Sequence, residues 1–194
     1  MNLQDLFRRR LEGSTTAIAS LEGRLEAIAG AADAILDRLG RGGTLYTCGN
    51  GGSAAEAMHL AEELIGRYCG RDRPPQPAVC LNADATALTC IANDFGFDEI
   101  FARQCRALLS DGDVLVVLTT SGDSENIVKA LQAAREKGAL TIGLLGKGGG
   151  ACAALCDHTI IVGGDNAAHI QEAHLVIVHL FCEAFERPGA RKTR

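Results

Sequence analysis

Hydrophobic positions change their spacing along the chain. Over residues 1–40, apolar side chains such as Ile18, Leu21 and Leu25 recur three and four positions apart, which predicts helix. Gly13–Ser14 is the expected break between a short helix and a long one. From residue 44 onward, short continuous apolar runs alternate with helical patterns. The runs predict strands at 44–48, 78–81, 113–119, 140–145 and 158–162, and the helical patterns lie at 53–67, 85–91, 98–109, 125–138, 151–155 and 168–186.

This alternation predicts one α/β domain. Continuously apolar strands separated by helices indicate a parallel sheet that is covered on both faces, here a five-stranded, doubly wound, flavodoxin-like three-layer sandwich. Residues 1–40 would form an N-terminal helical extension for oligomer packing, and residues 41–194 the α/β core. Ligands of such sheets bind beyond the carboxyl ends of the strands, where the turns at 49–53 and 119–124 are expected to lie.

The composition narrows the classes of function. The formal net charge is −5, and only 4% of the 194 residues are aromatic, which argues against a basic or base-stacking nucleic-acid surface. The basic run Arg191–Arg194 is expected to be a solvated terminus. No apolar stretch has the length of a membrane span, and residues 1–20 do not resemble a signal peptide. Together with eight cysteines that form no C-x-x-C pair, this predicts a cytoplasmic location.

The first glycine-rich turn follows the first predicted strand. Gly49–Ala54 satisfies the loose G-x-G-x-x-A dinucleotide pattern, but the second strand ends at Leu81–Asn82 without the acidic residue that this pattern requires. No P-loop sequence occurs. A tight turn with positive φ is the alternative, and it explains one glycine but not Asn50 and Ser53 beside two more. The turn therefore favours an anion at a helix N-terminus.

The second turn, Thr119–Ser124, is rich in hydroxyl groups. It places four hydroxyls within six residues at the start of a helix, where backbone N–H groups and the helix dipole favour an anion. Ordinary N-capping is the alternative, but a cap needs only one of these side chains. Since the turn contains no Lys or Arg, it would bind a phosphate through neutral donors.

The helix after the first turn carries a polar stripe beside its apolar face. His59, Glu63 and Arg67 follow one another at four-residue spacing. A surface ladder of ion pairs is one interpretation. The other is chemical: a His and a Glu at this spacing can bind one metal ion, and the stripe begins close to a phosphate-binding turn.

The last predicted helix is apolar on almost all sides after Ala173, which indicates burial in a subunit interface or helical bundle. His179 would need a partner in such surroundings, either a backbone carbonyl, a metal ion or a substrate. Helical periodicity places Glu172 on the face of His179 better than Gln171, and both residues remain candidates to act with it.

Seven motifs, spread over nearly the whole chain, resemble those of the phosphoheptose isomerases, which are sugar-isomerase (SIS) domain proteins acting on sedoheptulose 7-phosphate. They are Cys48–Ser53, Ala57–His59, Ala61–Glu63, Gly66–Tyr68, Asn93–Gly96, Thr120–Ser124 and Ile170–His174. The chain departs from the family at Ala168 and His169, where an acidic residue and an arginine or similar group are common. It also has Thr119 where Ser is common.

The resemblance implies a homotetramer with active sites at subunit interfaces and one zinc ion (Zn2+) per subunit. It implies that His59, Glu63, Gln171 and His179 bind the zinc, and so it selects Gln171 over Glu172. Glu63 and His179 are the implied acid–base pair. The implied contacts to the sugar phosphate are Asn50, Gly51, Gly52, Ser53, Arg67, Asn93, Asp94, Thr119, Thr120, Ser121, Ser124 and Gln171.

The resulting hypothesis is an aldose–ketose isomerase of heptose biosynthesis. It would convert sedoheptulose 7-phosphate to D-glycero-D-manno-heptose 7-phosphate through a cis-enediol. One alternative is a non-catalytic SIS-domain regulator that binds a sugar phosphate or a replication initiator. Another is an isomerase of a different sugar phosphate. A binding-only relative is expected to lack several of the four zinc ligands, and this chain keeps all of them.

Overall fold

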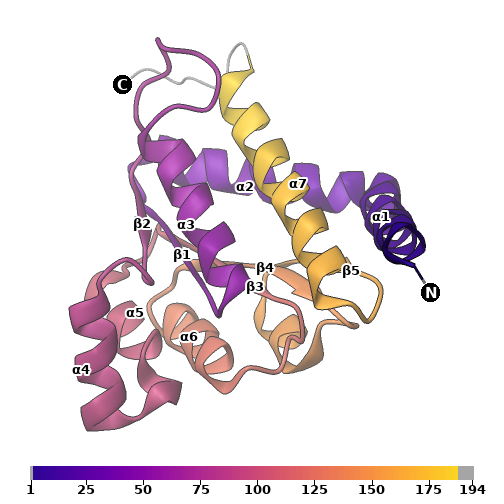
Figure 1. Cartoon of the computed structure of the whole chain (residues 1–194). Coiled ribbons are helices and arrows are strands. Elements are labelled where there is room, and N and C mark those ends of the chain that lie inside the picture. Colours follow the sequence, from indigo (N-terminus) through magenta and orange to yellow (C-terminus); the bar gives the residue numbers. More distant parts are fainter. Residues whose placement is uncertain (1, 188–194) are drawn as a thin grey trace.

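The computed structural model describes residues 2–187 and contains a five-stranded parallel sheet with the order β2-β1-β3-β4-β5 (Figure 1). The five predicted strands and the doubly wound, flavodoxin-like order are confirmed, and the strand order reverses between β1 and β3. The basic run Arg191–Arg194 lies outside the described residues. The strands are β1 (Leu45–Gly49), β2 (Ala78–Cys80), β3 (Val114–Thr119), β4 (Leu140–Gly146) and β5 (His158–Val162).

Helices cover both faces of the sheet. The α-helices are α1 (Leu3–Ala19), α2 (Leu25–Gly40), α3 (Gly52–Ile65), α4 (Ala85–Phe95), α5 (Ala102–Leu108), α6 (Glu125–Glu136) and α7 (Ala167–Glu186), with 3-10 helices η1 (Ser20–Arg24), η2 (Phe97–Glu99) and η3 (Gly150–Leu155). α2, α3 and α7 lie on one face, and α4, α5 and α6 on the other (Figure 1). In β3, Val116 and Leu118 pack with the first group and Leu115 and Val117 with the second. This alternation is the period-two geometry of a strand that is buried on both faces.

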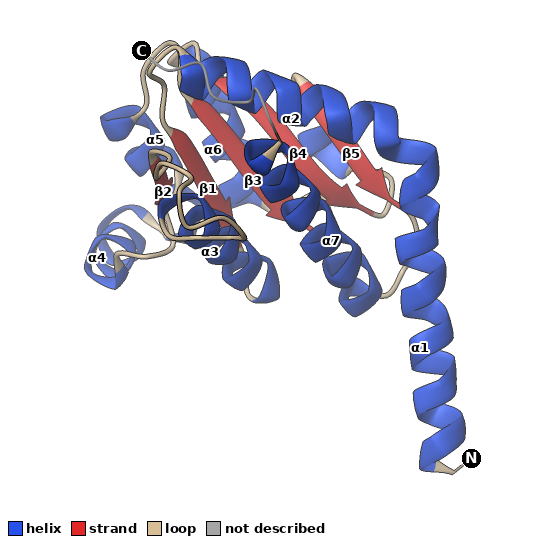
Figure 2. Cartoon of the chain, turned by 90° about the horizontal axis from the view of Figure 1, so that it is seen from above, coloured by secondary structure: helices blue, strands red, loops and turns tan. Residues whose placement is uncertain are grey.

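The N-terminal helices differ from the prediction at one point. α1 runs through Gly13 without a break, and the interruption comes instead at η1. Gly13 permits a close contact between helices, because a Cβ at this position would overlap the imidazole of His169 on α7. Arg10 strengthens the same contact, since its guanidinium donates hydrogen bonds to the carboxylate of Glu172. The N-terminal half of α1 extends beyond the sheet (Figure 2).

The polar segment that begins at Asn93 also differs from the prediction. The sequence pattern predicted helices at 85–91 and 98–109, with Asn93 and Asp94 between them. α4 instead continues to Phe95, so both residues lie on its last helical turn. The helix begins at a side-chain cap, because the Asp84 carboxylate accepts the N–H groups of Thr86 and Ala87 at 2.9 and 3.0 Å.

α7 spans 20 residues and packs against α1, α2 and α3. Neither α7 nor any other helix within residues 2–187 is apolar enough over a sufficient length to cross a membrane. The fully buried histidine of α7 is His174, whose Nε2 lies 3.2 Å from the carbonyl oxygen of Leu145. Since a carbonyl only accepts, Nε2–H is the donor. His179 is only half-buried. The histidine of α7 that is bonded to a backbone carbonyl is therefore His174 and not His179.

Burial lowers the pKa of His174 to about 4, and we predict a pH-dependent stability from this residue. The unfolded chain binds this proton below about pH 6.5, whereas the folded protein excludes it until pH 4 is approached, so stability is lost as the pH falls through this window. Between pH 7 and 5 the loss from His174 is about 2 kcal/mol. Urea unfolding at both pH values should show a smaller loss in His174→Gln, and an equal loss in both proteins would contradict the prediction.

Candidate active site

Two turns meet at the carboxyl edge of the sheet, where the strand order reverses. One joins β1 to α3 and the other joins β3 to α6. They are tied together by a reciprocal pair of amides: Asn50 Nδ2 donates to Asn126 Oδ1 at 2.9 Å, and Asn126 Nδ2 donates to Asn50 Oδ1 at 2.9 Å. Asn126 was not among the residues predicted for the site. This pair holds the side chain of Asn50 within the protein and fixes the separation of the two turns.

The turn before α3 brings its backbone close to α7. A Cβ at Gly52 would lie 2.5 Å from Gln171 Nε2, so a larger residue here would require the amide group of Gln171 to move. Gln171 Nε2 also lies 3.5 Å from Ser53 Oγ. The sequence-predicted residues Gly51, Gly52, Ser53 and Gln171 therefore form one group at the start of α3.

In the second turn the hydroxyl groups divide into two sets. Thr119 Oγ1 accepts the N–H of Gly122 and Ser121 Oγ accepts the N–H of Asp123, each at 3.2 Å, so these two side chains shape the turn itself. Ser124 occupies the N-cap of α6 but makes no side-chain capping bond. Its hydroxyl, with that of the partly exposed Thr120, remains available to an anion at this helix N-terminus.

One group of three side chains could hold a metal ion among the residues that the structure describes. His59 and Glu63 on α3 and His179 on α7 place one ligand atom each within 4.8 Å of the others. His59 Nε2 lies 3.1 Å from Glu63 Oε1, and the rings of His59 and His179 have centroids 5.3 Å apart.

The chemistry of this group fits zinc. Two imidazoles and a carboxylate are ordinary zinc ligands, and catalytic zinc sites have three protein ligands and one open position. The side chain of Glu63 is only 15% exposed, and within residues 2–187 its Oε2 has no hydrogen-bond partner. A buried carboxylate oxygen without a partner is costly, and a metal ion or a substrate hydroxyl would satisfy it.

Gln171 and Glu172 have different surroundings. Glu172 faces α1, and the hydrogen bond from Arg10, followed by that from Ser14, lowers the pKa of its carboxyl group. Gln171 faces the start of α3, eight residues before His179, which is about 12 Å along the helix. To reach the same ion as His179 in one chain, Gln171 would have to leave Ser53 and extend along α7. Its role as a ligand stays a prediction.

The remaining predicted contacts lie at the surface of the chain. Arg67 is exposed, with Nη1 3.4 Å from the carbonyl oxygen of Cys69. Asn93 and Asp94 are exposed on α4 and bonded to each other at 2.7 Å. A cavity of about 320 Å³ lies between Gly51 and α4, but its walls are mainly apolar, which does not suit a phosphate.

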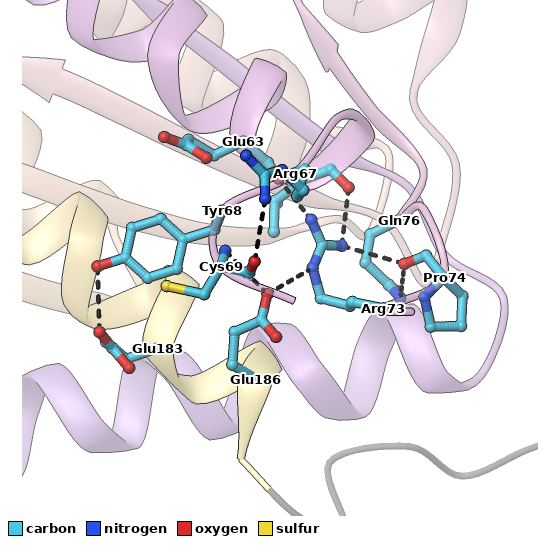
Figure 3. A network of polar contacts seen from close by, with 10 residues as sticks. Glu63, Arg67, Tyr68, Cys69, Arg73, Pro74, Gln76, Glu183 and Glu186 are labelled. Carbon is cyan, nitrogen blue, oxygen red and sulfur yellow. Dashed lines mark hydrogen bonds and ion pairs between the residues drawn. The ribbon is translucent and has the colours of Figure 1, made fainter. Parts of the chain in front are cut away.

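Two further side chains, Tyr68 beside His179 and Glu56 on α3, were not among the predicted site residues. Tyr68 lies beside His179, with ring centroids 5.8 Å apart, and its hydroxyl donates to Glu183 at 3.1 Å (Figure 3). Burial, followed by this bond to Glu183, raises the pKa of Tyr68 to about 12, so the phenol keeps its proton. Glu56 lies one turn before His59 on α3, and burial raises the pKa of its carboxyl group to about 8. Neither feature follows from the local sequence, because each depends on what packs around the side chain.

Comparison with known proteins identifies the family. A family model described as the SIS domain matches residues 12–146. A phosphoheptose isomerase from Rhodospirillum rubrum is 45% identical over 184 residues, which cover 95% of this chain and 97% of the relative. One from Solidesulfovibrio magneticus is 49% identical over 158 residues, which cover 81% and 76%.

Solved structures agree with the sequence relatives. A phosphoheptose isomerase from Francisella tularensis superimposes with a TM-score of 0.93 at 38% identity, covering 97% of this chain and 100% of that one. The structure from Neisseria gonorrhoeae gives 0.90 at 39% identity, covering 95% and 99%. Together with the paired turns at the switch of strand order and the facing side chains of α3 and α7, these matches show that the chain belongs to the phosphoheptose isomerases, enzymes of the SIS domain family.

Proposed function

We propose that this protein isomerises sedoheptulose 7-phosphate to D-glycero-D-manno-heptose 7-phosphate through a cis-enediol. The observation that carries the proposal is the grouping of His59, Glu63 and His179, which supplies an acid–base pair and metal ligands in one place. A binding-only SIS protein would have no use for this set. The departures at Ala168 and His169 concern the fit of the sugar, so shorter ketose phosphates are the informative comparison substrates.

Glu63 would move the proton between C1 and C2 of the open-chain sugar. Its two carboxylate oxygens have different surroundings, since Oε1 faces His59 and Oε2 has no partner within the described residues. Oε2 is therefore the oxygen available to accept the carbon-bound proton and return it to the neighbouring carbon. His179 would exchange the proton of the oxygen on the other side, and Tyr68 packs against its ring.

Zinc is the cofactor that we propose for this site, one ion per subunit. His59, Glu63 and His179 would hold it, and Gln171 would complete the set, from its own chain or from a neighbouring subunit. The bound ion would polarise the carbonyl and hydroxyl oxygens of the sugar and stabilise negative charge on the enediol.

The turn Thr119–Ser124 would anchor the phosphate. The turn ends at the N-terminus of α6, where it offers the hydroxyls of Thr120 and Ser124 together with backbone N–H groups. Anchoring one end of a flexible sugar fixes the position of its reactive end relative to Glu63. The rest of the sugar phosphate would be contacted by Asn50, Gly51, Gly52, Ser53, Arg67, Asn93 and Asp94.

The proposed assembly is a cytoplasmic homotetramer in which residues 1–194 form one SIS domain and residues 1–40 pack between subunits. The support is the surface of α1, which leaves Leu3, Phe7 and Leu11 exposed by 68%, 58% and 67% where the helix extends beyond the sheet (Figure 2). Large apolar side chains in a row on a projecting helix indicate a protein interface. With a net charge of −5, neither nucleic acid nor a membrane is a proposed partner.

Replacing Glu63 with Gln removes the proposed proton carrier while keeping its size. We expect turnover of sedoheptulose 7-phosphate to fall about 10²–10⁴-fold, with the assembly unchanged in sedimentation. Glu62→Gln is the matched control, because Glu62 is the exposed neighbour on the same helix. Near-normal turnover by Glu63→Gln would rule out the proton-transfer role.

Replacing Ser124 with Ala tests the phosphate turn. Because the Ser124 hydroxyl makes no capping bond, stability should change little, whereas KM for the sugar phosphate should rise about tenfold or more, as for a lost hydrogen bond to a charged group. Steady-state kinetics and thermal unfolding separate the two effects. A loss of stability with an unchanged KM would place the phosphate elsewhere.

Replacing Phe7 with Glu puts a charge into the exposed apolar row of α1. We expect the assembly to break into smaller units, because burying an unpaired carboxylate in an interface is costly. Analytical ultracentrifugation reports the change, with Arg9→Glu as a control on the same helix. A tetramer that persists in Phe7→Glu would show that α1 does not form the interface.

A further inference from the structure

The segment that follows α3 contains a buried arginine. After α3 ends at Ile65, the chain passes through an extended loop before β2 begins at Ala78. Arg73 lies in this loop, and its side chain is only 2% exposed. A guanidinium does not lose its charge in proteins, so its burial requires partners for its donors.

The partners of Arg73 come from two helices, α3 and α7, and from its own loop (Figure 3). Nη2 donates to the backbone carbonyl of Glu63 at 2.6 Å, and Nη1 donates to the carbonyl of Leu64 at 3.0 Å. Nε donates to the carboxylate of Glu186 on α7 at 3.2 Å. Nη1 also reaches the carbonyl of Pro74 at 3.0 Å.

Two of these bonds complete the C-terminus of α3. The last four carbonyls of a helix have no partner within the helix, and those of Glu63 and Leu64 belong to this group. The N–H of Gly66 satisfies Glu62. Arg73 supplies donors to the next two carbonyls, and the N–H of Gln76 adds a second one to Leu64 at 2.9 Å.

The arginine therefore connects the backbone of Glu63 to the helix that carries His179. Glu186 lies seven residues after His179, which is two turns along α7 and on the same side of the helix. The side chain of Glu186 is 16% exposed, so both charges of this pair are largely removed from water. A buried ion pair is weak as a source of stability, because an apolar pair of similar size serves as well. The fork geometry of the guanidinium instead fixes the position of the α3 carbonyls relative to Glu186 on α7.

We propose that Arg73 is a positioning residue for the metal and proton-transfer site. It holds the last turn of α3 against α7, so that His59 and Glu63 stay within reach of the ion that His179 binds. This inference rests on the proposed function for the identity of the ion, but the connection between the helices stands on the hydrogen bonds alone.

The test uses the full chain and three variants. Arg73→Met alone is not used, because it leaves the charge of Glu186 buried with only the N–H of Cys69, at 3.4 Å, as a partner, which can prevent folding. Arg73→Met with Glu186→Met removes both charges and keeps apolar volume. Arg73→Lys keeps the charge but cannot reach both carbonyls and Glu186. Arg187→Met is the matched control, because Arg187 pairs with Asp33 at the same end of α7, with both side chains more than half exposed, at 53% and 61%.

Three readouts apply to each protein: zinc affinity by chelator competition, thermal unfolding of the metal-free form, and amide hydrogen exchange over residues 60–77. In the double variant we expect zinc to bind about 10–100-fold more weakly, faster exchange at Gly66 and Gln76, and an unfolding temperature close to that of the wild type. Arg73→Lys should fall between the wild type and the double variant, and Arg187→Met should match the wild type.

Wild-type zinc affinity in the folded double variant would overturn the proposal, as would zinc loss of equal size in Arg187→Met. Unchanged exchange at Gly66 in the metal-free double variant would show that Arg73 does not fix the end of α3. Failure of the wild-type protein to bind zinc would overturn the proposed function and the metal part of this inference. The exchange experiment needs no metal, so the two failures are distinguishable.

Discussion

The packing of α3 against α7 is the contact on which the candidate site depends. His59 and Glu63 belong to one helix and His179 to the other, and their ligand atoms come within 4.8 Å only because the two helices lie side by side on the same face of the sheet (Figure 1). Small groups allow this approach at the start of α3, where Gly52 leaves room for Gln171. Polar groups secure its other end, where Arg73 spans from the carbonyl of Glu63 to Glu186.

The sheet has a different part in the site. Parallel strands bring both turns to one edge, and the reversal of strand order leaves a space between them for a ligand. The amide pair of Asn50 and Asn126 then sets how far apart the turns lie. The end of the site that we propose to bind the phosphate is thus built from backbone and neutral donors on a rigid frame. The end proposed to carry out the reaction is built from ionisable side chains between two helices.

Burial distinguishes the structural histidine, His174, from the two histidines that we propose to act in the site. His174 has no exposure and bonds to the carbonyl of Leu145, so its surroundings keep it neutral. His179, five positions later on α7, points to the opposite side of the helix and meets His59 and Tyr68 at a partly exposed surface. Helical geometry alone separates the two, because five residues rotate a side chain by about 140°.

The sequence by itself determined the parts that depend on local pattern. Continuous apolar runs and glycine-rich turns predicted the five strands, the doubly wound order and the two turns at strand ends, and motif similarity led to the family. The spacing of His59 and Glu63 was sufficient to pair them, since residues four apart share a helix face. The prediction of a helix break at Gly13 was wrong. A glycine fits there because the ring of His169 packs against it, and His169 lies on a helix more than 150 positions away in the sequence.

Only the tertiary structure decided which distant groups meet. Periodicity favoured Glu172 as the companion of His179, but Arg10 and Ser14 hold Glu172 against α1, and Gln171 faces the start of α3 instead. Arg73 and Asn126 carried no local signal, because an arginine in a loop and an asparagine in a helix are ordinary until their partners are known. The physical reason is that burial and hydrogen bonding between segments far apart in sequence arise from packing, which local pattern does not encode.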